Sequence, residues 1–270
     1  MWELILPLIS FLVGVVAAMA GIGGGIFMVP ILVLLYGFEP AYASGTSITV
    51  IIFMSLSSTL TYSRQKRIDY LLGLALAATT VPGAFLGAYA TSLLNKQILG
   101  LIFAFFLIFV AARMLIGNER KKETTKIKRK GKFRKLIDSY GKTFTYSVNF
   151  WLTPILGLVT GFLSGLLGIG GGSMLVPAMN LAIGVPIHIT VATSMFIMIF
   201  TSISGTLTHF WLQHIRFDYA AMLILGIIFG AQIGAHYAAK VSAKNLRRIF
   251  GVVLLIASIR MILKFTYLMP

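Results

Sequence analysis

Two glycine-rich segments carry the residue types best suited to chemistry in this sequence. Gly21-Ile22-Gly23-Gly24-Gly25 returns as Gly168-Ile169-Gly170-Gly171-Gly172, and a proline follows each copy. Glycine destabilises helices and has no Cβ, so each run should interrupt its helix and free backbone N–H groups beside the positive end of the next helix. Such groups can bind a small anion, although close helix packing is an alternative role. The glycines predicted to bind the anion are Gly21, Gly23, Gly24, Gly25, Gly168, Gly170, Gly171 and Gly172.

Hydroxyl side chains begin the predicted span that follows each glycine segment. Their oxygens and hydrogens can complete the hydrogen bonds of an anion, or they can bond back to their own helices. Both interpretations stay open for Thr46, Ser47, Thr193 and Ser194. Thr59 and Thr206 lie farther along the same spans, and we interpret them as bonding to their own helices.

Few amide or ionisable side chains fall inside the predicted spans. Gln232 is an amide well inside a predicted span, and it is a candidate for substrate contact. His209 and His236 are candidates for carrying a coupling proton, because histidine titrates near neutral pH and ionisable residues within a membrane usually serve function. We expect no catalytic residue, cofactor or metal: the glycine runs lack the Lys-Ser/Thr ending of a phosphate-binding loop, and the histidines lack metal-ligand spacing.

The composition indicates an integral membrane protein. Of 270 residues, 58% are hydrophobic and 11% charged, whereas a soluble domain has about 25% charged residues. The chain has no cysteine, which excludes disulfides and thiol chemistry. A net charge of +16 would suggest a nucleic-acid partner in a soluble protein, but 11 of the 23 basic residues lie between Arg120 and Lys142. One basic linker of this kind is typical of a cytoplasmic loop, so no nucleic acid is expected.

The second half of the chain repeats the first at an offset of 147 residues, the separation of Gly21 from Gly168. We predict a first transmembrane repeat over 1–117, a basic linker over 118–147 and a second repeat over 148–270. Short helical arms should flank each glycine run, with three spans after them. The helices are expected at 4–20, 26–36, 43–62, 70–91 and 97–116, and at 150–167, 173–184, 190–210, 219–239 and 248–266. Around Arg67 and Arg216 the alignment takes a two-residue slip.

Basic residues predict the orientation of the spans. Loop 63–70, the linker and the loop before 248 are basic and should be cytoplasmic, which places corresponding loops of the two halves on opposite sides. The predicted fold is therefore an all-α integral membrane protein, an inverted repeat of two halves, each a glycine-broken helical hairpin plus three transmembrane helices. Each hairpin is re-entrant or two thin spans, and both termini lie outside.

Apolar residues of the linker follow a helical spacing. They are Phe133, Leu136, Ile137, Tyr140 and Phe144, placed among lysines and arginines. This pattern favours an interfacial helix that lies on anionic lipid headgroups, with a disordered basic linker as the alternative.

The duplicated Gly-Ile-Gly-Gly-Gly-x-x-x-Val-Pro, with Gly45-Thr46-Ser47 after the first copy and Ala192-Thr193-Ser194 after the second, resembles the TauE/SafE sulfite exporter family, also called the 4-toluene sulfonate uptake permeases. The resemblance covers both halves and leaves out the basic linker. It implies a prokaryotic inner-membrane permease for small sulfur oxyanions or organosulfonates, such as sulfite, thiosulfate, sulfoacetate or sulfolactate. Family members are described as secondary carriers coupled to protons.

These observations predict a secondary active transporter that moves a small sulfur-containing anion by alternating access, in the inner (plasma) membrane, with a proton as coupling ion. The alternatives are an anion channel, a non-transporting membrane subunit and an intramembrane serine hydrolase built on Ser164 with His209 or His214. The hydrolase is the weakest, because Ser164 aligns with Ala17 and the duplicated residues do not gather around it. Whether the chain forms a homodimer is left open.

Overall fold

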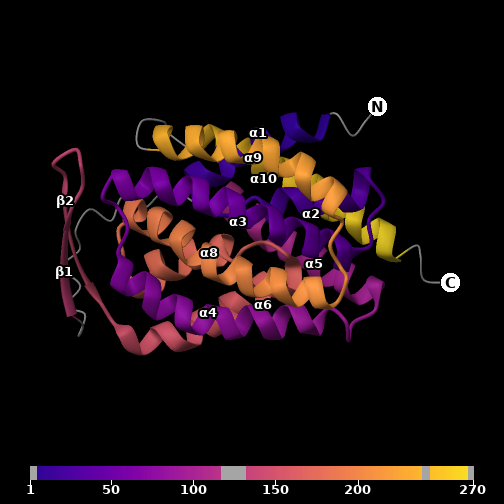
Figure 1. The fold of residues 1–270 in the computed structure, drawn as a ribbon, viewed down its shortest axis with the longest axis horizontal. Coiled ribbons are helices and arrows are strands. Elements are labelled where there is room, and N and C mark those ends of the chain that lie inside the picture. Colours follow the sequence, from indigo (N-terminus) through magenta and orange to yellow (C-terminus); the bar gives the residue numbers. More distant parts are fainter. Residues whose placement is uncertain (1–4, 117–131, 239–243, 267–270) are drawn as a thin grey trace.

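The computed structural model describes residues 5–116, 132–238 and 244–266, and most of its helices run along the long axis of the molecule (Figure 1). The first half contributes α1 (Leu6–Ala20), α2 (Gly25–Leu35), α3 (Pro40–Arg64), α4 (Tyr70–Ala90) and α5 (Lys96–Ile116). The second half contributes α6 (Thr153–Leu167), α7 (Gly172–Pro177), the π-helical η3 (Ala178–Ile183), α8 (Ile187–Trp211), α9 (Phe217–Tyr237) and α10 (Lys244–Thr266), after a short 3-10 turn, η2 (Phe150–Leu152). The prediction of an all-α membrane fold is confirmed.

Glycine ends the first helix of each half. α1 and α6 each have a proline in the first turn and stop at Gly21 and Gly168, whose φ angles are +69° and +66°. Glycine takes this left-handed conformation without the steric cost of a Cβ. Each helix has 15 residues, or about 22 Å at 1.5 Å per residue, which is less than the roughly 30 Å of a bilayer's hydrocarbon core.

By length and composition, six described helical segments can cross a membrane. They are α3, α4, α5 up to Leu115, Phe150–Leu167, α8 and α9, and the shorter apolar helices are α1, α2 and Gly172–Ile183. The chain is therefore a multi-pass membrane protein. The helix expected over 248–266 is α10, which packs against α5.

The helix boundaries repeat without the slip that the alignment used. α4 begins at Tyr70 and α9 at Phe217, so the offset of 147 residues continues through both loops. The match of Arg67 with Arg216 is therefore wrong, and the structural equivalent of Arg216 is Asp69. Asp69 caps α4, whereas Arg216 makes no side-chain cap on α9.

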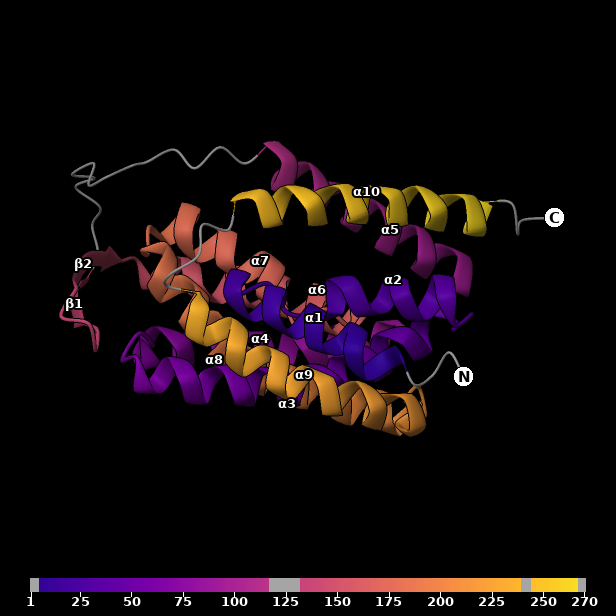
Figure 2. The ribbon, with the colours of Figure 1, turned by 90° about the horizontal axis from the view of Figure 1, so that it is seen from above.

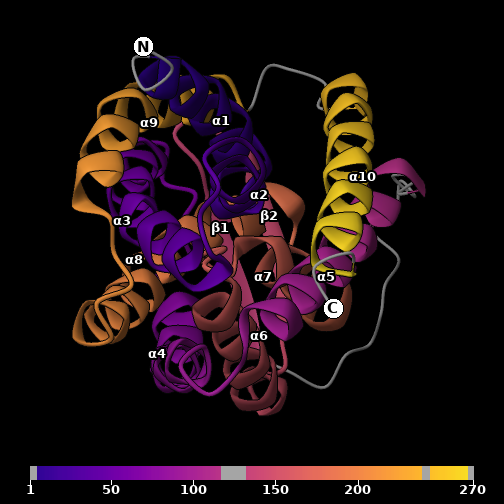
Figure 3. The ribbon, with the colours of Figure 1, turned by 90° about the vertical axis from the view of Figure 1, so that its right-hand side faces the viewer.

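Corresponding helices of the two halves run in opposite directions. α3 packs against α8 with Gly45 beside His209 and with Ile48 beside Gly205, an order that requires antiparallel helices. α5 and α10 also lie side by side and antiparallel (Figure 2). Seen end-on, α2 and α7 lie near the middle of the bundle, with α1 and α9 on one side and α4 and α6 on the opposite side (Figure 3).

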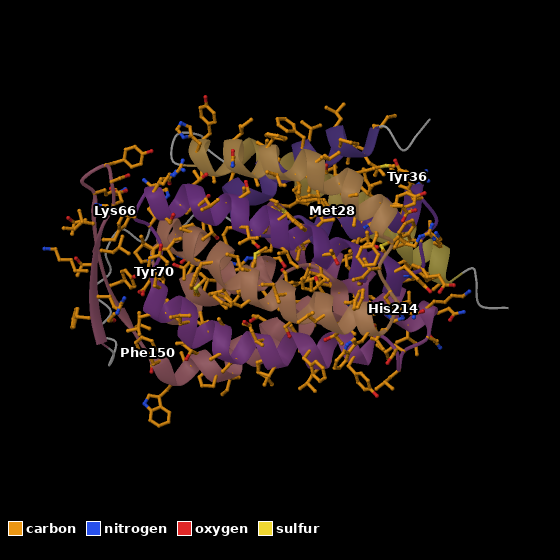
Figure 4. The ribbon with its side chains drawn as sticks, in the orientation of Figure 1. Met28, Tyr36, Lys66, Tyr70, Phe150 and His214 are labelled. Atoms are coloured by element: carbon orange, nitrogen blue, oxygen red, sulfur yellow. The ribbon has the colours of Figure 1, made fainter. Side chains whose placement is uncertain are left out.

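The two glycine-broken hairpins enter the bundle from opposite ends. The α1–α2 hairpin opens at the end where Tyr36 and His214 lie, and the α6–α7 hairpin opens at the end where Lys66, Tyr70 and Phe150 lie (Figure 4). The start of α1 and the end of α10 are at the Tyr36 end (Figure 1). The sides of the membrane to which these ends belong stay a prediction.

Small residues bring helices together at two pairs, Gly83-x-x-x-Gly87 on α4 and Gly230-x-x-x-Gly234 on α9. A Cβ on Gly83 would meet backbone atoms of α6, with the Phe162 nitrogen at 3.0 Å. A Cβ on Gly230 would meet the backbone of Phe11 on α1. The pairs α4–α6 and α1–α9 are equivalent in the two halves, so the duplicated glycines form the same contact twice.

The interfacial helix expected in the linker is wrong for the part that the structure describes. Lys132–Ile137 and Thr143–Val148 form the strands β1 and β2 of an antiparallel hairpin at one end of the bundle (Figure 1). Alternation decides the outcome: Phe144, Tyr146 and Val148 are buried against the bundle, and Phe133 on the opposite face is 84% exposed. A strand places every second side chain on one face, which the apolar and β-branched residues here satisfy. Residues 118–131 lie outside the described residues.

Two buried ion pairs join this hairpin to the α3–α4 loop. Arg67 contacts Asp138 at 2.8 Å, and Arg134 contacts Asp69 at 2.6 Å. Arg67 therefore pairs with Asp138 rather than with Asp69 two residues away, and Asp69 caps α4 instead. In the second half, Arg216 and Asp218 pair locally at 3.4 Å. Burial opposes ionisation of Asp138, but the Arg67 guanidinium and nearby backbone N–H groups hold its pKa below the ordinary value.

We expect Gly230→Ala to destabilise the protein by about 1–3 kcal/mol, because the added methyl group overpacks the α1–α9 contact. Thermal unfolding of the purified protein in detergent measures this. Leu225→Ala is the control on the same helix, since Leu225 is 62% exposed and should change the unfolding temperature little. Equal unfolding temperatures for Gly230→Ala and the control would contradict the close contact.

Candidate functional site

The two glycine turns lie side by side and antiparallel inside the bundle. Gly25 faces the carbonyl oxygen of Gly168, and Gly172 faces that of Gly21. Between these contacts, a Cβ on Gly23 would lie 2.6 Å from the carbonyl oxygen of Ile169. The two turns are thus brought together, with backbone of the opposite turn leaving no room for a side chain at Gly23, Gly25 and Gly172. Gly24 and Gly171 instead face side chains, with Ile227 nearest to Gly24 and Ser164 nearest to Gly171.

Two serines join the turns across the halves. Ser47 Oγ of the first half donates to the Gly168 carbonyl at 2.9 Å, and Ser194 Oγ of the second half donates to the Gly21 carbonyl at 3.0 Å. Both serines are fully buried. The sequence predicted that these hydroxyls face an anion or their own helices. In this conformation both hydroxyls satisfy a glycine carbonyl of the opposite half, and for Ser194 the expected bond to its own helix is present too. Ser194 also donates to its own helix at Val191, 2.8 Å away.

The threonines next to these serines make a second symmetric pair of contacts. Thr46 Oγ1 accepts a hydrogen bond from the Arg216 N–H at 3.1 Å, and Thr193 Oγ1 accepts one from the Asp69 N–H at 3.0 Å. Thr46 and Thr193 therefore hold the loops before α9 and α4 rather than facing the glycine turns.

Backbone donors remain at the turns. The N–H groups of Gly23, Gly24 and Gly25, and those of Gly170, Gly171 and Gly172, meet no acceptor among the described residues. These groups are buried, and buried unpaired N–H groups are rare and costly in proteins. An anion between the turns would satisfy several of them at once.

The turns are closed against each other in this conformation. The Met198 methyl group would lie 2.9 Å from a Cβ on Gly23 and 3.0 Å from one on Gly170, and Ile51 approaches Gly170 as well. Ile51 and Met198 are equivalent in the two repeats. Cavities of about 430 and 450 Å³ lie at the two ends of the bundle, where neither is lined by a glycine of the turns. Access to the turns therefore requires Met198 and Ile51 to move.

Buried hydroxyls without partners surround the second turn more than the first. Ser164, which precedes Gly168 by one helical turn, and Ser173, which follows Gly172, have no hydrogen-bond partner among the described residues. Ser164 lies against Gly171, with its Cβ 3.3 Å from an added Cβ there. Sequence reasoning did not assign these serines to the anion site. The signal was the departure from the repeat, since the first half has Ala17 and Ile26 at their places.

The two candidate histidines lie in different environments. His209 is fully buried, and its Nε2 donates to the Gly165 carbonyl at 3.1 Å, as its repeat equivalent Tyr62 donates to the Ala18 carbonyl at 2.8 Å. Because a carbonyl only accepts, the neutral ring carries its hydrogen on Nε2, and its buried Nδ1 has no hydrogen-bond partner in the part of the chain that the structure describes. His236 is exposed at the end of the bundle that carries the β1–β2 hairpin, which we call the hairpin end.

Three further side chains differ from expectation. Gln232 is exposed beside His236 at the hairpin end, so it does not reach the glycine turns. Thr59 and Thr206 were expected to bond to their own helices, and this is wrong: their hydroxyl oxygens are buried without a partner among the described residues. The repeat places both at the same position of α3 and α8, where the hydroxyl reaches no carbonyl.

The hydrolase alternative lacks its central contact. A serine nucleophile needs a base within hydrogen-bond distance, yet Ser164 Oγ has no partner among the described residues and the His209 Nε2 is occupied by Gly165.

Ser47→Ala should lower the free energy of unfolding by about 1 kcal/mol, the usual contribution of one intramolecular hydrogen bond. Ser194→Ala should lower it less, because one hydroxyl hydrogen is shared between Gly21 and Val191. Thermal unfolding of both variants tests the order, with Ser55→Ala as a control whose hydroxyl bonds only its own helix. A larger loss for Ser194→Ala would refute the assignment.

Comparison with known proteins assigns a family to this arrangement. The family described as Sulfite exporter TauE/SafE matches residues 6–261. The probable membrane transporter protein YunE of Bacillus subtilis is 36% identical over 96% of both chains. The probable membrane transporter protein MJ0441 of Methanocaldococcus jannaschii is 27% identical, also over 96% of both chains.

No solved structure matches the chain. The match to the family nevertheless includes both glycine turns and every helix of the two halves but the end of α10. The relatives bear transporter names, which point to a membrane transporter rather than an enzyme. The chain belongs to the TauE/SafE sulfite exporter family.

Proposed function

We propose that the chain is a secondary transporter that moves a small sulfur-containing oxyanion by alternating access, and that the paired glycine turns bind the anion. One observation carries the proposal: six glycine N–H groups from two crossing turns are buried without acceptors among the described residues. Sulfite, thiosulfate and sulfonates offer several acceptor oxygens on one small ion. Backbone donors can hold such a charge without a buried arginine, which would be costly within a membrane.

The proposed motion exchanges contacts between the halves. We infer that the halves form an inverted repeat across the inner membrane. The β1–β2 hairpin and the α3–α4 loop would lie on the cytoplasmic side, and both termini would lie outside. Opening toward one side would separate one glycine-broken helical hairpin from the span of the other half that carries its serine partner. One serine bridge would then break, either Ser47 to Gly168 or Ser194 to Gly21. Opening toward the other side would break the other bridge. The unbranched Met198 side chain can leave the turns by rotamer changes alone.

Uptake by proteoliposomes tests the transport itself. Purified protein is supplied with sulfite, thiosulfate, sulfoacetate or taurine, with and without an inward proton gradient. We expect at least one sulfur oxyanion to accumulate above its external concentration when the gradient is present. An anion channel would only equalise the concentrations, and protein-free liposomes give the background.

Ser164→Ala and Ser173→Ala should each raise the KM for uptake about tenfold or more, because each removes a hydrogen bond to a charged ligand worth about 1.5–3 kcal/mol. The native fold should persist, since neither hydroxyl bonds a described residue. Thr49→Ala is the matched control: its buried hydroxyl donates to the Gly45 carbonyl of its own helix at 2.8 Å and should not affect KM. An unchanged KM in both serine variants would show that the anion does not bind beside the second glycine turn.

We also propose that His209 carries the coupling proton, because its Nδ1 is a buried acceptor without a partner among the described residues. His209→Tyr installs the residue that the first half uses at this place and can keep the bond to Gly165, as Tyr62 bonds Ala18. The variant should retain uptake down a substrate gradient and lose stimulation by a proton gradient. Full stimulation in this variant would exclude His209 from coupling.

A further inference from the structure

A groove of about 450 Å³ lies at the hairpin end of the bundle, away from the glycine turns. We call it the basic groove. Arg64 and Gln65 at the end of α3 form one side, Gln232 and His236 in the last turns of α9 form the other, and Tyr140 of the β1–β2 turn closes it. These elements all lie at the Lys66 end of the molecule (Figure 4).

The walls of the basic groove are fixed before any ligand binds. Gln65 Nε2 donates to the Ala235 carbonyl at 3.1 Å, which joins α3 to α9. The backbone carbonyl of Gln65 accepts a hydrogen bond from the Ser139 N–H at 3.0 Å, which joins the end of α3 to the β1–β2 hairpin. The Arg67 guanidinium lies 5.1 Å from the centre of the Tyr140 ring and holds Asp138 as well. The groove is therefore a formed site rather than a gap between mobile side chains.

The charge of the basic groove is unbalanced. Arg64 makes no ion pair or hydrogen bond with any described residue, and no acidic side chain lines the groove. The acids of the adjoining loop and hairpin, Asp69 and Asp138, are already paired with Arg134 and Arg67. Gln232 and His236 likewise make no hydrogen bond with described residues. Guanidinium, imidazole and amide donors that line one groove suit an oxyanion, and arginine can bind two phosphate oxygens at once.

The duplicated chain provides an internal comparison. At the repeat equivalents of Arg64 and Gln65 the second half has Trp211 and Leu212. At the equivalents of Gln232 and His236 the first half has Phe85 and Tyr89. The charged and amide groups are therefore not a consequence of the repeat, and they occur at the hairpin end alone among these equivalent positions.

Exposed apolar side chains lead away from the basic groove. Leu60 precedes Arg64 by one helical turn and is 59% exposed, and Phe229 precedes Gln232 by about one turn and is 63% exposed. α3 and α9 pack against each other, so these side chains flank the same seam on the outer surface. A ligand with an oxyanion and apolar chains would contact both parts.

We propose that the basic groove binds the phosphate of an anionic phospholipid, with the acyl chains along the α3–α9 seam. Arg64 supplies the charge, Gln232 and His236 supply donors, and Tyr140 covers the headgroup. Basic pockets between membrane helices bind such headgroups. A free phosphate ion shares the headgroup chemistry but has no apolar part to contact the α3–α9 seam. The phospholipid is therefore favoured as the ligand.

Native mass spectrometry of the detergent-purified full-length protein, titrated with phosphatidylglycerol, phosphatidylcholine or inorganic phosphate, tests the site. Wild type should retain one more phosphatidylglycerol molecule than Arg64→Gln, with affinity at that site roughly fivefold or more lower in the variant, the loss expected for one basic residue. Lys66→Gln is the charge-matched control in the same loop. Gln213, its repeat equivalent, takes the same backbone conformation, with φ of 56° against 55° for Lys66.

Three outcomes would overturn the proposal: equal phosphatidylglycerol retention by Arg64→Gln and wild type, equal retention of phosphatidylcholine, or displacement of the bound lipid by inorganic phosphate. If Arg64→Gln fails to fold, His236→Tyr changes the same groove to the residue that the first half already accommodates at Tyr89. Loss of the extra lipid in His236→Tyr supports the site, and its retention refutes it.

Discussion

The structure depends on how two interrupted helices satisfy their backbone groups inside an apolar bundle. Water cannot reach the ends of α1 and α6, so each carbonyl and N–H group that the glycine breaks release needs a partner from protein or ligand. The carbonyls of Gly21 and Gly168 receive hydroxyl hydrogens from Ser194 and Ser47 of the opposite half. The neighbouring glycine N–H groups receive none from the described residues. This division between satisfied acceptors and free donors is the basis of the anion site that we propose at the glycine turns.

The duplication makes each half a comparison for the other. Contacts that serve the fold recur at the same offset: Ser57 donates to Ile228 as Ser204 donates to Val81, both at 2.8 Å. Three departures from the repeat lie close together in the structure. A histidine replaces Tyr62, and serines replace Ala17 and Ile26, all around the second glycine turn.

The hairpin adds a second departure from symmetry. It binds the α3–α4 loop through Asp138 and Arg134, and its Tyr146 hydroxyl donates to Asp69 at 2.7 Å. Burial, followed by the hydrogen bond to Asp69, raises the pKa of Tyr146. The Asp69 N–H in turn reaches Thr193, the neighbour of the bridging Ser194. The hairpin is thus connected through hydrogen bonds to Thr193. The equivalent loop before α9 makes the matching bond from the Arg216 N–H to Thr46, but its ion pair with Asp218 is exposed.

The sequence by itself determined the membrane class, the duplication, the glycine breaks and the helix boundaries to within four residues, because hydropathy, glycine and proline act locally along the chain. It also placed the family, since the repeated glycine motif can be read without coordinates. Only the tertiary structure decided which residue each of these hydroxyls hydrogen-bonds. The partners of Ser47, Thr46 and Thr193 lie more than a hundred residues away, and no local pattern records them. The same holds for the linker, whose apolar spacing also fits a helix. Its strand pair is stabilised by the ion pairs to the α3–α4 loop and by burial of one face against the end of the bundle. Long-range hydrogen bonds and burial, rather than local preference, settle both.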